Sequence, residues 1–302
     1  MKVLRRLISV LSSCIAVHDL SCHGKSSLTV IMPVLEAMGV EVSPLPTAIL
    51  STQTDGFSDY VFSDQTAVMK RVISHWEELG MTADAVYSGF LGSREQIGLV
   101  RQVIDTQKNK RTDSLVVIDP VLGDDGRLYG PMEDAMIPAM RELVTGADIV
   151  TPNMTEACLL CNVPWKKTWT EPEALEMVEM IHAFGPRNAV ITGILLENDG
   201  GNHYGVAIFD GQDGGQHGKA SLHVHERHPV SLPGSGDLFA ALMCGFMLKR
   251  VSFSMAAHQA AGLTALAVRR TCEAGYGRRH GVAVALILPD VVDALRTDSC
   301  SW

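Results

Sequence analysis

The chain has 302 residues, of which 46% are hydrophobic and 20% are charged, and its formal net charge is −9. A chain of this length and composition can bury a large core and is typical of a globular protein. Because it is acidic and has no cluster of lysines and arginines, we exclude a nucleic-acid-binding surface and expect a small-molecule ligand.

The N-terminal residues imitate a secretory signal. Lys2, Arg5 and Arg6 precede the apolar run 7–11. No small-residue cleavage site follows, and the run continues directly into a buried segment, so we interpret residues 1–12 as a loosely attached N-terminal extension. No apolar stretch reaches the roughly 18–20 residues that cross a bilayer. The seven cysteines are scattered and odd in number, which is typical of reduced thiols. We therefore predict a cytoplasmic protein without membrane contact.

Short apolar runs alternate with amphipathic segments along the chain. Six runs are predicted to be strands: Cys14–Val17, Val40–Pro46, Ala85–Ser88, Leu115–Ile118, Ile149–Thr151 and Ala189–Thr192. This alternation is typical of a parallel sheet covered by helices on both faces. Thr170 and Glu173 predict a capping box, and Gly185 ends that helix. We expect one α/β domain over residues 1–302, in which the Gly- and Asp-rich stretch 198–218 forms a hairpin or surface loop.

Polar residues and glycines gather at the ends of five of the predicted strands. They are His18-Asp19, Gly89, Asp119-Pro120, Thr151-Pro152-Asn153 and Thr192-Gly193. In an open parallel sheet the ligand crevice lies beyond the carboxyl ends of the strands. We therefore expect these residues to share one site.

The loop Gly234-Ser235-Gly236-Asp237 precedes the apolar run 238–248. Its two glycines leave backbone N–H groups free to approach an anion, and the following helix directs its positive end to the same place. Asp237 then stands beside a phosphate cradle as a base. An ordinary loop, with Asp237 as a helix cap, would fit the pattern as well.

Two other motifs suggest sites that we do not favour. Gly24-Lys25-Ser26 ends like a P-loop, but the glycine required five positions earlier is Asp19. We interpret this segment as the beginning of a helix that runs to Met38. His223 and His225 have a spacing that can bind a metal, but no carboxylate or cysteine lies in register, so we favour a solvated strand face.

Several segments together resemble pyridoxal kinases of the ribokinase-like superfamily. They are Ser88–Ser93, Asp119–Asp124, Thr151–Glu156, Val190–Thr192 and Gly234–Ala241. The resemblance extends from about Cys14 to the last helix. The set of motifs is specific to the superfamily and less specific to pyridoxal. It implies a three-layer αβα sandwich around a mostly parallel sheet.

The resemblance implies ATP-dependent phosphorylation of the 5'-hydroxyl of pyridoxal, pyridoxamine or pyridoxine, the salvage reaction of vitamin B6. Asp237 would accept the proton of the alcohol. The N–H groups of Gly234, Ser235 and Gly236 would hold the transferring phosphoryl group. Ser235 replaces the threonine common in the family, a change that a cradle of backbone groups should tolerate.

The resemblance also implies a nucleotide and metal site. Asp119 and Glu156 would organise Mg²⁺, directly or through water, because this cation prefers oxygen ligands and keeps several waters. Four residues would contact or border the nucleotide: Asp124, Tyr129, Asn153 and Thr192. The family also suggests a homodimer and leaves open a role for a monovalent cation.

The alcohol-binding end departs from the family pattern. His18 aligns with a serine that usually meets the pyridine ring, whereas Thr47 and Phe90 match ring-side positions. Residues 48–54 differ from the usual segment with Ser-Asn-His-Thr. His18 could hydrogen-bond the pyridine nitrogen or the phenolic oxygen, or it could select another ring.

Two alternatives therefore stay open. One is the same phosphoryl transfer to another small alcohol, such as hydroxymethylpyrimidine or a sugar. The other is a catalytically weak relative kept for ligand binding or regulation. The loss of Asp237 or of the loop glycines would indicate the second alternative, and both are present.

Overall fold

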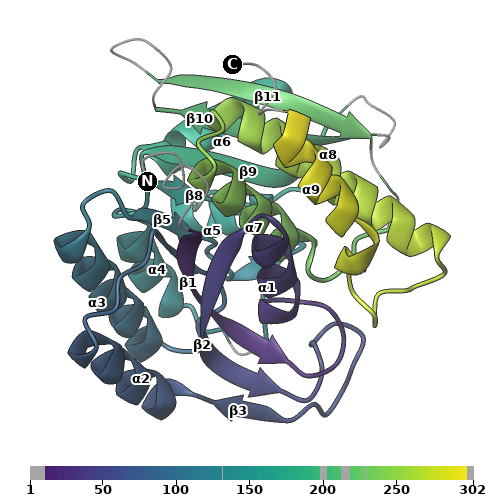
Figure 1. Ribbon diagram of the computed structural model, residues 1–302. Helices are drawn as coiled ribbons and strands as arrows, with labels where there is room; N and C mark the ends of the chain where they lie inside the picture. Colours follow the sequence, from purple (N-terminus) through teal and green to yellow (C-terminus); the bar gives the residue numbers. More distant parts are fainter. Residues whose placement is uncertain are drawn as a thin grey trace, which may run out of the picture.

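The computed structural model describes residues 11–130, 132–197, 203–211, 218–226, 228 and 230–297. Within these residues, nine strands form one sheet in the order β11-β10-β9-β8-β5-β4-β1-β2-β3 (Figure 1). The strands are β1 (Ser12–Ser21), β2 (Val40–Leu50), β3 (Phe62–Asp64), β4 (Ala85–Ser88), β5 (Leu115–Ile118), β8 (Ile149–Val150), β9 (Asn188–Leu195), β10 (His203–Asp210) and β11 (Lys219–Glu226). A separate two-stranded ribbon pairs β6 (Gly123–Asp124) with β7 (Arg127–Leu128).

The centre of the sheet is parallel and its edges are antiparallel. Strands β2, β1, β4, β5, β8 and β9 pair in parallel, which confirms all six predicted strands. Antiparallel pairing adds β3 at one edge and β10 and β11 at the other. Strand β3 was not predicted, whereas the antiparallel pairing of β10 with β9 and β11 confirms the hairpin alternative for its stretch. All three residues of β3 are exposed, so it carries no apolar run, and β10 lies within the stretch expected to be a hairpin or loop. Residues 198–202 and 212–217 of that stretch lie outside the described residues.

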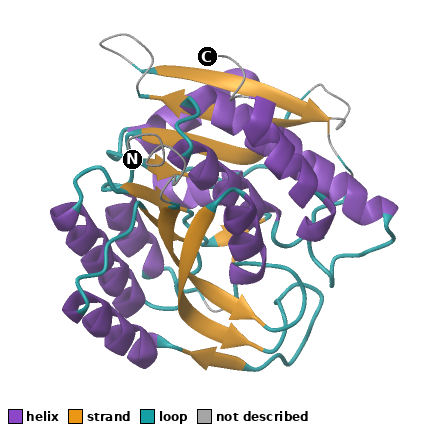
Figure 2. Cartoon of the chain, in the orientation of Figure 1, coloured by secondary structure: helices purple, strands orange, loops and turns teal. Residues whose placement is uncertain are grey.

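Helices cover both faces of the sheet (Figure 2). One face packs against α2 (Thr66–Glu78), α3 (Arg94–Lys110), α4 (Met136–Val144), α5 (Met154–Cys161) and α6 (Glu171–His182). The other packs against α1 (Leu28–Ala37), α7 (Ser235–Leu248), α8 (Phe253–Glu273), the short 3-10 helix η2 (Val284–Leu286) and α9 (Leu288–Thr297). Side chains alternate along β1, so Ile15 and Val17 enter one core and Cys14 and Ala16 the other. The predicted three-layer αβα sandwich is confirmed.

The predicted boundaries of two helices lie within a few residues of the observed ones, α1 (Leu28–Ala37) and α6 (Glu171–His182). Thr170 and Glu173 form the expected capping box of α6. Helix α1 ends at Ala37, before Gly39, whose φ of +68° few other residues adopt. An unpredicted capping box joins Asn153 and Glu156 at the start of α5, and it places both residues at the end of the sheet where β8 stops.

The structure describes only Leu11 and Ser12 of the proposed N-terminal extension, and Ser12 already belongs to β1. The first strand thus begins two residues earlier than predicted. Residues 1–10 lie outside the described part of the chain. Among the described helices, none is both long and apolar enough to cross a membrane.

Candidate active site

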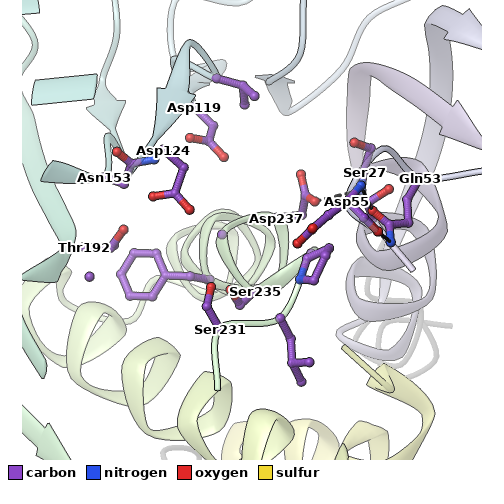
Figure 3. A pocket seen from close by; sticks show the side chains of 18 of the residues that line it. Ser27, Gln53, Asp55, Asp119, Asp124, Asn153, Thr192, Ser231, Ser235 and Asp237 are labelled. Carbon is purple, nitrogen blue, oxygen red and sulfur yellow. Dashed lines mark hydrogen bonds between the residues drawn. The ribbon is translucent and has the colours of Figure 1, made fainter. Parts of the chain in front are cut away.

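A cavity of about 940 Å³ lies beyond the carboxyl ends of the parallel strands, at the N-terminus of α7. Figure 3 shows Asp237 and Ser235 between two groups of polar side chains. We call one group the β5–β9 side, which consists of Asp119, Asp124, Asn153, Glu156 and Thr192. We call the other the β1–β2 side, which consists of Asp19, Ser27, Gln53 and Asp55, and we assign the cavity residue Phe90 to it.

The loop before α7 requires glycine at one position and leaves space at another. Gly234 has φ +82°, and an added Cβ would lie 2.6 Å from the carbonyl oxygen of Lys25. A side chain there would be strained by its backbone conformation and would also clash. An added Cβ at Gly236 would have no atom within 4 Å. Gly234 therefore shapes the loop, while Gly236 leaves room beside the backbone.

The first turn of α7 offers free hydrogen-bond donors. The N–H of Ser235 already donates to the carbonyl of Leu232 at 3.3 Å. Within the described residues, the N–H groups of Gly236 and Asp237 have no such acceptor. Unpaired N–H groups and the helix dipole make this terminus suitable for an anion. The sequence predicted donors at Gly234, Ser235 and Gly236. In the structure the N–H of Ser235 already has an acceptor, and the N–H of Asp237 is an additional free donor.

Asp237 is half-buried and lines the cavity. Its Oδ2 accepts the backbone N–H of Ser27 at 2.7 Å, and the described residues provide no partner for Oδ1. Burial raises the pKa of Asp237 to about 7, and the nearby carboxylate of Asp19 adds to this rise. A carboxylate with a free oxygen and a pKa near neutrality suits a general base.

Asp119 and Glu156 form a pair of buried carboxyl groups, only 7% and 3% exposed. Burial raises the pKa of both; repulsion from Asp237 adds to the effect at Asp119, and repulsion from Asp119 adds to it at Glu156. Glu156 accepts the N–H groups of Leu122 at 3.2 Å and Asn153 at 2.8 Å. Neither carboxyl group forms an ion pair with a described lysine, arginine or histidine.

Such uncompensated carboxylates fit a bound Mg²⁺. In the described part of the chain, no group of three or more His, Cys, Asp and Glu side chains could hold a metal ion. A Mg²⁺ ion at Asp119 and Glu156 would therefore take its other ligands from water and from nucleotide phosphates, as this cation commonly does.

The four residues expected around the nucleotide all line the cavity: Asp124, Tyr129, Asn153 and Thr192. The side chain of Asn153 accepts the N–H of Glu156 at 3.0 Å and donates to the carbonyl of Gly123 at 2.8 Å. An isolated bridge pairs the backbones of Asn153 and Thr192. The structure thus brings together residues from β6, the turn after β7, the start of α5 and the middle of β9.

Three residues were predicted to lie beside the ring of the substrate. Phe90 lines the cavity, whereas Thr47 and His18 do not. Thr47 is fully buried, and its hydroxyl donates to the carbonyl of Phe90 at 2.9 Å. Thr47 therefore supports the backbone of Phe90 without lining the cavity itself.

The structure places His18 behind the cavity wall. Its ring is fully buried, 4.4 Å from the ring of Tyr87 between centroids, and a Cβ at Gly89 would lie 2.3 Å from it. Among the described residues, neither ring nitrogen has a hydrogen-bond partner. Burial lowers the pKa of His18 to about 3, so the ring is neutral. The expected contact between His18 and a substrate ring is absent from this geometry.

Its neighbour Asp19 lines the cavity instead. The β1–β2 register shifts by one residue between His18 and Leu20, and irregularities of this kind redirect side chains near active sites. The pair His18-Asp19 was recognised at the strand end, but adjacent strand residues point to opposite faces. The sequence alone did not show which of these two side chains is directed towards the ligand.

Ser27, Gln53, Asp55 and Arg278 are further cavity residues that the sequence did not indicate. Gln53 donates to the carbonyl of Asp55 at 2.6 Å and to that of Arg278 at 3.3 Å. The guanidinium group of Arg278 also donates to the carboxylate of Asp55, from Nε at 2.9 Å. No local pattern connects positions more than 220 residues apart.

The paired histidines lie at the far edge of the site. His223 and His225 are half-buried and face His258 of α8, with ring centroids 5.9 and 5.4 Å away, and His225 lines the cavity. Burial and the neighbouring His258 lower the pKa of both. They thus pack against a helix, and the solvated strand face that we favoured is wrong in this respect.

The chain is similar to known proteins in sequence and in structure. Residues 18–282 match the family described as phosphomethylpyrimidine kinase. The pyridoxal kinase of Bos taurus is 28% identical over 240 residues, which cover 70% of this chain and 73% of that one. A protein of Bacteroides thetaiotaomicron, provisionally named phosphomethylpyrimidine kinase and crystallised with pyridoxal, is 35% identical. Its TM-score is 0.85 over 95% of this chain and 96% of that one. The pyridoxal kinase of Lactobacillus plantarum is 29% identical, with a TM-score of 0.84 over 96% and 99% of the two chains.

Proposed function

Because this chain belongs to the phosphomethylpyrimidine kinase family, we propose that it transfers the γ-phosphoryl group of ATP to the 5'-hydroxyl of pyridoxal, pyridoxamine or pyridoxine. The observation that carries this function is the half-buried carboxylate of Asp237, with one free oxygen, beside unpaired N–H groups of α7 in one cavity. Similarity to pyridoxal kinases, and to a protein crystallised with pyridoxal, supports a B6 vitamer as the acceptor.

In this reaction Oδ1 of Asp237 accepts the proton of the alcohol while the alcohol oxygen attacks the γ-phosphorus. The bond between that phosphorus and the β,γ-bridging oxygen breaks, and ADP leaves with the bonding electrons. The N–H groups of Gly236 and Asp237 donate to the transferring phosphoryl oxygens.

Asp119 and Glu156 would hold Mg²⁺, directly or through water. Bound Mg²⁺ neutralises phosphate charge during phosphoryl transfer. Asn153 and Thr192, which line the cavity, would contact nucleotide phosphate, and Tyr129 would border the nucleotide. A monovalent cation, a homodimer, a cytoplasmic location and a single domain over residues 1–302 stay predictions.

A second acceptor, hydroxymethylpyrimidine, is favoured by one observation. The β1–β2 side contains Asp19 and Gln53 where the sequence suggested a pyridoxal-type pocket around His18 and Thr47. Both reactions would use Asp237 and the α7 terminus in the same way. They differ only in the ring that this side of the cavity accepts.

The test measures ADP formation with ATP and Mg²⁺ against the three B6 vitamers, hydroxymethylpyrimidine and simple sugars, with Asp237→Asn as the blank. We expect phosphorylation of a B6 vitamer that the variant lacks. Faster turnover of hydroxymethylpyrimidine or a sugar would support kinase activity but overturn the proposal that the acceptor is a B6 vitamer. Absence of turnover by a folded, nucleotide-binding protein would overturn the proposed reaction for this panel and favour a binding or regulatory role.

A further inference from the structure

Ser27 connects two carboxyl groups of the site. Its backbone N–H donates to Oδ2 of Asp237 at 2.7 Å, and its hydroxyl donates to Oδ1 of Asp19 at 2.5 Å. The other oxygen of Asp19 accepts the hydroxyl of Ser21 at 3.2 Å. Asp19 and Ser27 are each only 7% exposed, so these bonds are well shielded from water. One residue thus holds two carboxylates, one through its main chain and one through its side chain.

The backbone of Ser27 is in an unfavourable conformation. Its φ is 48° and its ψ is −130°, a combination that suits glycine and strains any residue with a Cβ. Ser27 is also the N-cap of α1, a position where serine usually accepts a hydrogen bond from the first turn. Its side chain makes no such cap bond, because the hydroxyl is directed to Asp19 instead.

We propose that Asp19 and Ser27 are positioning residues for Asp237. The hydrogen bond from the Ser27 hydroxyl to Asp19 keeps the Ser27 backbone in its strained conformation. The Ser27 N–H is thereby directed at Oδ2 of Asp237, and Oδ1 is left to face the alcohol. This inference rests on the proposed function, because it assigns a role in the orientation of the base.

The two residues act on the charge of Asp237 in opposite directions. The Ser27 N–H stabilises the ionised carboxylate and lowers its pKa, whereas the negative charge of Asp19 raises it. Other titratable groups that interact with Asp237 are Asp119 after β5, Tyr87 on β4 and Tyr129 after β7. Removal of the hydrogen bond from the Ser27 N–H should therefore raise the pKa of Asp237, and removal of the Asp19 charge should lower it.

The kinetic test compares Ser27→Ala with Ser27→Gly. Alanine lacks the hydroxyl yet keeps the Cβ, so the backbone should relax and the N–H should turn away from Asp237. Misplacement of a reacting group by about 1 Å costs on the order of 100-fold, and we expect a kcat about 10- to 100-fold lower with little change in the KM for ATP. Glycine adopts the native φ and ψ without strain, so Ser27→Gly should recover most of this loss.

Ser252→Ala is the matched control. Ser252 is the N-cap of α8, also without a side-chain cap bond, but its φ of −61° is ordinary. Its replacement should leave kcat unchanged. Wild-type kcat in Ser27→Ala would overturn the inference. So would equal losses in Ser27→Ala and Ser27→Gly, because the hydroxyl itself would then be required.

Asp19→Asn separates positioning from substrate contact. Asparagine can still accept the Ser27 hydroxyl bond but has no charge. We expect the acidic limb of the kcat/KM profile to move to lower pH while the KM for the alcohol stays within about threefold. A raised KM with an unchanged pH profile would mean that Asp19 binds the alcohol directly, and it would overturn the positioning role.

A measurement without turnover distinguishes failure of this inference from failure of the proposed function. The carboxyl carbon of Asp237 can be followed by ¹³C NMR in aspartate-labelled protein and identified from its loss in Asp237→Asn. We expect the pKa of Asp237 to rise in Ser27→Ala and to return towards the native value in Ser27→Gly. An unchanged pKa in Ser27→Ala would overturn the inference even in an active kinase. The expected shifts in a protein that phosphorylates no tested alcohol would support the inference and overturn the reaction.

Discussion

The two sides of the cavity differ in how their residues are distributed along the chain. On the β5–β9 side, Asp119 follows β5 directly, Asn153 lies three residues after β8 and Thr192 lies within β9, and all were expected there. On the β1–β2 side, Ser27, Gln53 and Asp55 come from loops, and the sequence assigned no role to any of them. Residues at strand ends are positioned by the sheet itself. Residues in loops are positioned by contacts between distant segments, which short motifs do not encode.

The two sides also differ in charge compensation. Asp119 and Glu156 are buried without a cationic partner among the described residues. On the other side Asp55 is paired with Arg278, and the buried Asp19 accepts the hydroxyl groups of Ser21 and Ser27. The first side therefore fits a metal-bound, highly charged nucleotide. The second presents a paired carboxylate and the Phe90 ring, which fits a neutral or weakly charged small molecule. Variants that separate binding on the two sides test this distinction.

The largest effect is expected at the boundary between the two sides. Asp237→Asn removes the proton acceptor and should lower kcat by about 10²- to 10⁴-fold. Coupled measurement of ADP release gives kcat, and calorimetric titration with nucleotide serves as the control, because binding on the β5–β9 side should persist. Activity within tenfold of the native protein would show that Asp237 is not the base.

Substitutions of the two loop glycines, Gly234 and Gly236, should have separate effects on stability and on phosphate binding. Gly234→Ala combines a positive φ with a Cβ 2.6 Å from the Lys25 carbonyl, so its melting temperature should fall clearly. Gly236→Ala meets no atom within 4 Å and should melt like the native protein. Its methyl group would nevertheless stand beside the free N–H groups and should lower kcat at least tenfold. Native kcat in a folded Gly236→Ala would contradict the phosphate cradle.

Glu156→Gln tests the metal on the β5–β9 side. Glutamine can keep the capping box with Asn153, so the start of α5 should stay folded. Loss of the charge should raise the Mg²⁺ concentration for half-maximal rate by about 10- to 100-fold. A titration of rate against Mg²⁺ measures this, with Glu173→Gln as the control, because Glu173 forms the capping box of α6 away from the cavity. Equal Mg²⁺ dependence in both variants would exclude a metal role for Glu156.

Substitutions on opposite sides should change different Michaelis constants. Phe90→Ala removes apolar area from the β1–β2 side and should raise the KM for the alcohol about 10-fold without change for ATP. Thr192→Val keeps the side-chain volume on the β5–β9 side and should raise only the KM for ATP, by a few-fold. Steady-state kinetics with each substrate varied in turn checks both. Parallel changes in both constants would mean that the two sides do not bind separate substrates.

The smallest effect is expected at His18. His18→Leu removes two buried ring nitrogens that have no partner among the described residues and introduces an apolar side chain of similar size, so stability should be unchanged or higher. Since His18 does not line the cavity, the KM for pyridoxal should stay within about threefold. Thermal unfolding and steady-state kinetics measure the two quantities. A large rise in the KM for pyridoxal would restore His18 as a ring contact.

The sequence by itself determined the sheet, its helical layers and the β5–β9 side of the site. Short, mainly apolar runs predicted all six parallel strands, because strands covered on both faces are rich in apolar residues. Polar residues at their ends, such as Asp119 and Thr192, were then placed together by the geometry of a parallel sheet. The exposed strand β3 has no apolar run and was not predicted, and β10 was expected only as part of a hairpin or surface loop.

Only the tertiary structure decided the β1–β2 side. A one-residue shift in the register of β1 against β2 accompanies the placement of Asp19 in the cavity and of His18 behind its wall. A single step along a strand reverses the direction of a side chain, so the choice between adjacent residues depends on pairing. Contacts such as Ser27 with Asp237 and Asp55 with Arg278 join positions more than 200 residues apart. Their formation depends on how the loops pack around the end of the sheet, which no local pattern specifies.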